Sequence, residues 1–267
     1  MYPDFRHPPT QPLPPAFCHE PYPPQVEAWM AQLDPRQRIA QLLHVPSWSH
    51  RDETHAQAVL HLIETYGIGG VIFFQGDPQA QVRYTRRYQS ASKVPLLISI
   101  DAEWGLAMRL ADSPVFPYAM TLGAVQDLSL IYEMGLDLAR QCRRLGIHIN
   151  FAPTVDINTE PDNPVIGFRS FGSDPDEVAA RGRAYMQGLQ DGGVLAVAKH
   201  FPGHGDTATD SHHSLPVLPH DHARLEAVEL HPFRTLSGPG WGASCRDTCA
   251  YRPTTTDHTR VPRRPGP

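Results

Sequence analysis

The sequence lacks three features that would place it in a special class of protein. No apolar run approaches the ~18 residues of a membrane-spanning helix, so we expect no membrane span. The 4 cysteines are too few and too scattered for a disulfide framework. A net charge of -5 argues against a surface for nucleic acid. The 267 residues, 40% of them hydrophobic, instead suit one globular domain.

The two ends of the chain also lack the apolar pattern of its middle. Residues 1–30 form a Pro-rich leader without the apolar core of a secretory signal peptide. As written, this start predicts a cytoplasmic protein, and a misassigned start would permit export. Residues 237–267 contain no Leu, Ile, Phe or Met, so we expect no buried strand there. The sequence therefore predicts a folded domain over 31–236 and a frameshifted or disordered tail.

Within the predicted domain, apolar segments of strand length alternate with helix signals. Strands are expected at 43–48, 70–74, 95–100, 147–156 and 194–198. A capping-box pattern, Asp34 with Gln37, begins one of the helices, and Gly67 ends another. Because no hairpin signals join the strands, the alternation predicts a parallel sheet. The lack of a G-x-G-x-x-G turn after the first strand favours a barrel over an open sheet.

The stretch VLAVAKHFPGHGDTATDSHHSLP, from Val194 to Pro216, concentrates ionisable groups at the end of the fifth strand. Parallel α/β proteins gather their functional sites at the carboxyl ends of their strands, so we expect a site here. A solvated, His-rich loop is the simplest alternative. A zinc site is another, because the residue types suit zinc; its ligands would be His200, His204, Asp206 and His212.

The same stretch resembles the β-N-acetylglucosaminidases of glycoside hydrolase family 3, which carry K-H-F-P-G-H-G-D-T followed by D-S-H. The resemblance extends from Asp34 to Arg234 and implies a TIM-type (β/α)8 barrel, incomplete, with about five of eight units present. On this resemblance Asp210 and His212 form the acid/base dyad. The residues that it implies for sugar binding are Asp101 and Arg109 in IDAEWGLAMRL, Arg169 in GFRSF, Lys199 and His200. Trp104 departs from the Gly that is commoner in the family.

The resemblance implies a retaining hydrolase that removes terminal β-linked N-acetylglucosamine or N-acetylhexosamine from glycans such as cell-wall fragments. It implies a carbohydrate substrate and neither a metal nor another cofactor, and it leaves the oligomeric state open. No nucleophile is assigned, because Asp221, Asp247 and Asp257 do not follow apolar runs in a Ser/Thr-Asp motif. A non-catalytic truncated product or sugar-binding fragment therefore stays an alternative, as does a metal-dependent hydrolase.

Overall fold

A computed structural model describes residues 24–207, 217–218, 220–236, 243–246 and 250–251. Its main feature is a parallel sheet in the order β1-β2-β3-β4-β5-β7. The strands are β1 His44–Ser47, β2 Gly70–Phe73, β3 Leu97–Ile100, β4 Ile149–Asn150, β5 Leu195–Phe201 and β7 Ala243–Arg246. A second, parallel pair joins β6 Val217–Leu218 to β8 Ala250–Tyr251. Sequential parallel pairing from β1 to β5 confirms the alternation read from the sequence.

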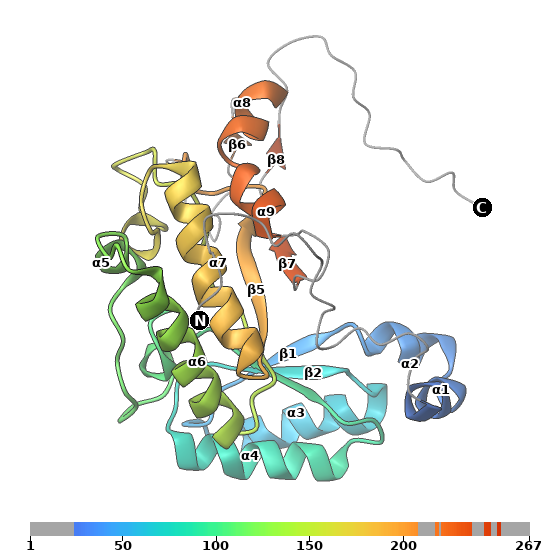
Figure 1. Cartoon of the computed structure of the whole chain (residues 1–267). Helices are drawn as coiled ribbons and strands as arrows, with labels where there is room; N and C mark the ends of the chain where they lie inside the picture. The colour runs from blue at the N-terminus through green and yellow to red at the C-terminus, as the bar shows by residue number, and fades with distance from the viewer. Residues whose placement is uncertain (1–23, 208–216, 219, 237–242, 247–249, 252–267) are drawn as a thin grey trace, which may run out of the picture.

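The long helices that connect the strands are α3 Glu53–Tyr66, α4 Pro78–Ala91, α6 Leu128–Arg144 and α7 Pro175–Asp191. They pack on the outer side of the curved sheet, α3 and α4 next to β1 and β2, and α6 and α7 next to β5 (Figure 1). The short ones are α1 Pro24–Ala31, α2 Pro35–Ala40, α5 Ala119–Leu122, α8 His222–Ala227, α9 His231–Leu236 and the 3-10 turns η1 Leu106–Met108 and η2 Gly167–Arg169. In the described part of the chain, no helix combines the length and the apolar character that crossing a membrane requires.

The helix ends follow the local signals of the sequence. Asp34 accepts a hydrogen bond from the Gln37 backbone, and the Gln37 side chain returns one to the Asp34 backbone, which completes the predicted capping box. Asp127 caps α6 in a similar way through the Ser129 backbone. Gly67 ends α3 with a φ of 65°, a left-handed conformation that suits glycine. These caps fix where α2, α3 and α6 begin or end.

The core lies between the sheet and its helices. Ile98 and Ile100 of β3 are fully buried, as is Leu138 of α6. Helices α6 and α7 approach closely because glycines face one another where they meet. A Cβ atom on Gly188 would lie 2.1 Å from the Tyr132 carbonyl oxygen, and one on Gly135 would lie 2.5 Å from the Tyr185 carbonyl oxygen. The absence of side chains at these two positions therefore sets the spacing of the helices beneath the site.

The strands differ from the sequence prediction in two places. Residues 243–246 form β7 and pair with β5, in the tail where the sequence predicted no buried strand. Pairing uses backbone N–H and C=O groups, which the Pro-free Ala-Ser-Cys-Arg segment supplies without large apolar side chains. The fourth strand is also shorter than the expected 147–156, since only Ile149–Asn150 forms β4 and Thr154 makes an isolated bridge to Lys199.

Candidate active site

Charged side chains converge where three neighbouring strands end. Asp101 follows β3 directly, Asp156 lies beyond β4, and Lys199 and His200 lie near the end of β5, just before its last residue, Phe201. Because these strands are parallel neighbours, their carboxyl ends lie at one edge of the sheet. We call the group formed there the strand-end cluster; its members are Asp101, Glu103, Arg109, Asp156, Arg169, Lys199 and His200.

Asp101 joins two of the residues predicted to bind sugar. Its Oδ1 atom lies 2.8 Å from Lys199 Nζ, and its Oδ2 atom lies 2.8 Å from Arg109 Nη2. Burial alone would raise the pKa of Asp101, but Lys199 and Arg109 outweigh burial and lower it. The aspartate is therefore held as a carboxylate, able to accept hydrogen bonds from a ligand's hydroxyl groups.

Glu103 is a member of the cluster that the sequence reading missed. Its Oε1 atom lies 2.8 Å from Lys199 Nζ, and its two oxygens accept from Arg169 at 2.7 and 2.9 Å. Burial favours a raised pKa, yet Lys199 and Arg169 lower the pKa of Glu103 far below its usual range. Its place two residues after Asp101, at a strand end, was the signal that could have identified it.

Asp156 is the second missed member, and it orients His200. Fully buried, it contacts His200 Nδ1 at 2.7 Å and accepts from the His200 and His204 backbones at 3.1 and 2.7 Å. Burial would raise its pKa, but His200 and these N–H groups lower it. Arg169 Nη2 lies 3.2 Å from His200 Nε2. Because a guanidinium only donates, Nε2 accepts in this contact, which places the ring hydrogen on Nδ1, facing Asp156.

The backbone beneath the cluster is fixed by two buried side chains. The Tyr185 hydroxyl, from α7, donates toward the carbonyl oxygens of Ala102 and Glu103 at 3.0 and 3.2 Å. The Asn150 side chain, from β4, accepts from Ala102 N at 3.0 Å and donates to its carbonyl at 3.3 Å. Asp101 and Glu103 therefore stand on a segment that neighbouring elements hold in place, as a preorganised binding site requires.

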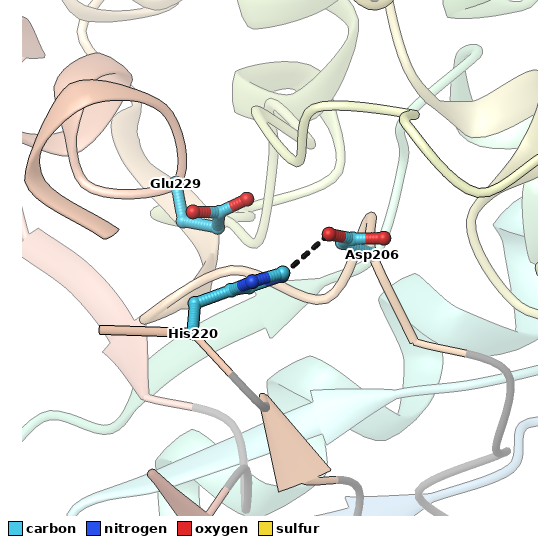
Figure 2. Close-up of side chains that lie close together, drawn as sticks. All are labelled: Asp206, His220 and Glu229. Carbon is cyan, nitrogen blue, oxygen red and sulfur yellow. Dashed lines mark hydrogen bonds and ion pairs between the residues drawn. The ribbon is translucent and has the colours of Figure 1, made fainter. Parts of the chain in front are cut away.

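The predicted dyad, Asp210 and His212, lies outside the described residues, and so does its loop from 208 to 216. The residues on either side of that gap form a second polar group, which we call the flank cluster: Asp206, His220, Arg224 and Glu229. His220 Nε2 lies 2.5 Å from Asp206 Oδ2, so the contact links the two sides of the gap (Figure 2).

Asp206, His220 and Glu229 offer possible metal ligands within 4.8 Å of one another (Figure 2). Arg224 already lies between the carboxylates, with Nη1 2.8 and 3.0 Å from the Glu229 oxygens and Nη2 3.5 Å from Asp206 Oδ2. Burial raises the pKa of Glu229 despite the arginine. A guanidinium thus supplies the positive charge that a metal ion would bring.

The zinc group considered from the sequence does not assemble in the described residues. His200 faces Asp156 and Arg169, His204 Nδ1 contacts the Thr207 hydroxyl, and Asp206 contacts His220. The fourth expected ligand, His212, lies outside the described residues. Of the three members that the structure describes, only Asp206 stands in a cluster with metal-ligand spacing, and its neighbours there are different residues.

Comparison with known proteins gives the family. Residues 35–240 match the glycosyl hydrolase family 3 N-terminal domain. The chain belongs to glycosyl hydrolase family 3. The chain is 40% identical over 212 residues to "Beta-hexosaminidase LpqI" of Mycobacterium tuberculosis, a match that covers 77% of this chain and 52% of LpqI. It therefore spans about half the length of that relative.

Solved structures of family 3 proteins share the fold. A β-N-acetylglucosaminidase from Paenibacillus sp. FPU-7 superposes with a TM-score of 0.76 at 39% identity, covering 82% of this chain and 43% of that chain. LpqI from M. tuberculosis superposes with a TM-score of 0.70 at 33% identity, covering 89% and 69%. These matches confirm the TIM-type (β/α)8 barrel, present here in part.

Proposed function

We propose that the strand-end cluster binds the terminal N-acetylhexosamine of a β-linked glycan. The observation that carries this proposal is the single network in which Asp101, Glu103 and Lys199 meet at the carboxyl ends of the strands. Carboxylates and cations held in alternation present acceptors and donors at fixed spacing, which is what recognition of several sugar hydroxyl groups requires. Family membership and the hexosaminidase names of the relatives support this substrate class.

The reaction that we propose for the whole enzyme is retaining hydrolysis. In that chemistry one group protonates the glycosidic oxygen while a carboxylate forms a glycosyl-enzyme intermediate. His212 would donate the proton, and Asp210 would fix its tautomer. The proposal assigns no nucleophile: Asp221 caps α8 by accepting from Arg224 N at 2.8 Å, and Asp247 and Asp257 lie outside the described residues.

Titration with methyl N-acetyl-β-glucosaminide, followed by calorimetry or NMR, tests the binding proposal. Saturable binding by this chain, weakened at least about tenfold in Asp101→Asn, is expected because the neutral amide loses charge-assisted acceptors. Arg87→Gln, which changes an exposed ion pair on α4, serves as the matched control and should bind as the original chain does. No saturable binding, or equal binding by Asp101→Asn, would contradict the proposal.

A sugar-binding fragment without catalysis is the second candidate function, favoured by the structural role of Asp221 as a helix cap. Hydrolysis of an aryl N-acetylglucosaminide separates the two. Turnover that is lost in His212→Ala supports the hydrolase, because acid catalysis contributes about 10²- to 10⁴-fold. Saturable sugar binding without turnover supports the binding fragment.

A further inference from the structure

Three aromatic rings form an exposed group beside the strand-end cluster. The Trp104 and Tyr118 ring centroids lie 4.9 Å apart, those of Tyr118 and Phe168 4.6 Å, and those of Trp104 and Phe168 6.2 Å. Tyr118 is 44% exposed and Phe168 is 50% exposed. We call this group, Trp104, Tyr118 and Phe168, the ring cluster. Its exposure contrasts with the aromatic residues of the core, such as Phe73 and Tyr88, which are fully buried.

The ring cluster is assembled from three separate segments. Trp104 follows β3, Tyr118 precedes α5, and Phe168 lies in η2. The backbone holds the first two together, since Phe116 N donates to the Trp104 carbonyl at 3.0 Å. Gly105 permits this approach: its φ is 98°, and a Cβ atom there would lie 2.9 Å from the Phe116 ring. Large rings brought together at a surface, without being buried, are typical of a ligand-binding surface.

The ring cluster is joined directly to the proposed sugar site. Trp104 is the residue after Glu103, and Phe168 is the residue before Arg169, so the backbone positions of these two rings directly adjoin those of the charged pair. The bidentate pair between Glu103 and Arg169 therefore also holds Trp104 near Phe168.

We propose that the ring cluster binds the second pyranose of a glycan whose terminal N-acetylhexosamine occupies the strand-end cluster. This subsite rests on the proposed function. A β-linked pyranose with equatorial substituents presents axial C–H bonds on its flat faces, and the electron-rich face of an aromatic ring attracts these weakly positive hydrogens. Phe168, the most exposed of the three rings, supplies that face. Trp104 and Tyr118, tilted at 69° to each other, support it from the side.

The proposal predicts a preference that the charged cluster alone does not give. Stacking on one aromatic ring is worth about as much as an aromatic pair, so the 267-residue chain should bind N,N'-diacetylchitobiose about three- to tenfold more tightly than methyl N-acetyl-β-glucosaminide. Phe168→Ala should bring the ratio of the two affinities to about one, whereas Phe168→Tyr should restore it. Tyr66→Ala is the matched control, because Tyr66 is 55% exposed at the opposite end of the strand-helix unit.

Calorimetric titration of all four proteins with both sugars, at matched folded fraction by circular dichroism, is the test. A disaccharide preference that is lost in Phe168→Ala and kept in Phe168→Tyr and Tyr66→Ala supports the subsite. Monosaccharide binding without a disaccharide preference, or a preference that survives in Phe168→Ala, overturns the subsite and leaves the proposed function standing. Binding of neither sugar overturns both. Concentration-dependent self-association that Phe168→Ala abolishes would assign the rings to a second copy of the chain and also overturn the subsite.

Discussion

The strand-end cluster and the flank cluster each combine carboxylates, a histidine and arginine, yet they differ in what supports them. The strand-end cluster stands on β3 and β5, and its Lys199, Glu103 and Asp156 side chains are at most 6% exposed. The flank cluster stands on the short helix α8 and on residues beside the undescribed 208–216 segment, and Asp206, His220 and Arg224 are 21–33% exposed.

The difference shows in the carboxyl groups. In the strand-end cluster, paired cations lower the pKa of Asp101 and Glu103 against the effect of burial. In the flank cluster, burial prevails over Arg224 and raises the pKa of Glu229. Three cations, Lys199, Arg109 and Arg169, on two carboxylates hold charge in place for a ligand, whereas one partly exposed arginine shared by two carboxylates mainly joins segments of chain.

Lys199→Met should have the largest effect on stability, and it tests most directly the difference between the strand-end cluster and the flank cluster. The change removes the ammonium group between Asp101 and Glu103, leaving two buried carboxylates with arginine partners alone. We expect the free energy of unfolding to fall by about 3–5 kcal/mol, measured by urea denaturation, with loss of sugar binding. Lys199→Arg keeps the charge and should recover part of the stability. If the free energy of unfolding of Lys199→Met fell by less than about 1 kcal/mol, the strand-end cluster would contribute no more to stability than an exposed ion pair does.

The second largest effect should come from acid, which removes the stabilisation that the carboxylates of the strand-end cluster provide. The folded pKa values of Asp101, Glu103 and Asp156 lie below their unfolded values, so their stabilisation is complete above the unfolded values of about 4 and is lost as the pH falls through the folded ones. The free energy of unfolding, from denaturation series between pH 7 and 3, should therefore decrease with acid.

Glu103→Gln removes one of these titrations. It should lower the free energy of unfolding at pH 7 by about 1.5–3 kcal/mol and reduce the slope with which that free energy decreases as the pH falls. Glu64→Gln, at an exposed position of α3, is the control and should leave the slope as it was. An unchanged slope in Glu103→Gln would show that Glu103 does not have a lowered pKa in the folded protein.

Arg224→Met tests the flank cluster. It should lower the free energy of unfolding at pH 7 by about 1–3 kcal/mol, because Glu229 is left without its cation. The loss should be smaller than that in Lys199→Met because Arg224 is partly exposed. The raised folded pKa of Glu229 should rise further, so the loss should shrink as the pH falls and the carboxyl takes up a proton.

The same substitution frees the possible metal ligands. Zinc should raise the melting temperature of Arg224→Met more than that of the original chain, since binding to the folded state alone stabilises it. Equal zinc responses of the two proteins would contradict the view that Arg224 takes the place of a cation.

Arg87→Met should have the smallest effect and sets the baseline for the other variants. Arg87 pairs with Glu53 between α4 and α3, and Glu53 is 61% exposed. Solvent and salt screen such a pair, so the thermal midpoint should stay within error of the original chain. If Arg87→Met lowered the stability as much as Arg224→Met does, the position of an ion pair in the fold, more than its burial, would decide how much the pair contributes to stability.

Part of the strand-end cluster carries a signal in the local sequence. Lys199, His200 and Asp101 stand at strand ends that the apolar runs before them locate, and the structure joins Lys199 to Asp101 across 98 residues of chain. Glu103 and Asp156 were missed because a place beyond the end of a strand does not by itself separate a site carboxylate from a helix cap or a surface carboxylate. Only their partners, Arg169 and His200, which are 66 and 44 residues away, give them a role.

The sequence by itself determined the alternation of strands and helices and the helix ends at Asp34, Asp127 and Gly67. These features depend on neighbouring residues and on backbone geometry. Tertiary structure alone decided the pairing of β5 with β7, the exposure of the ring cluster and the partners of each buried carboxylate. Backbone pairing is open to almost any non-proline segment, and a buried charge takes its pKa from groups that folding brings to it.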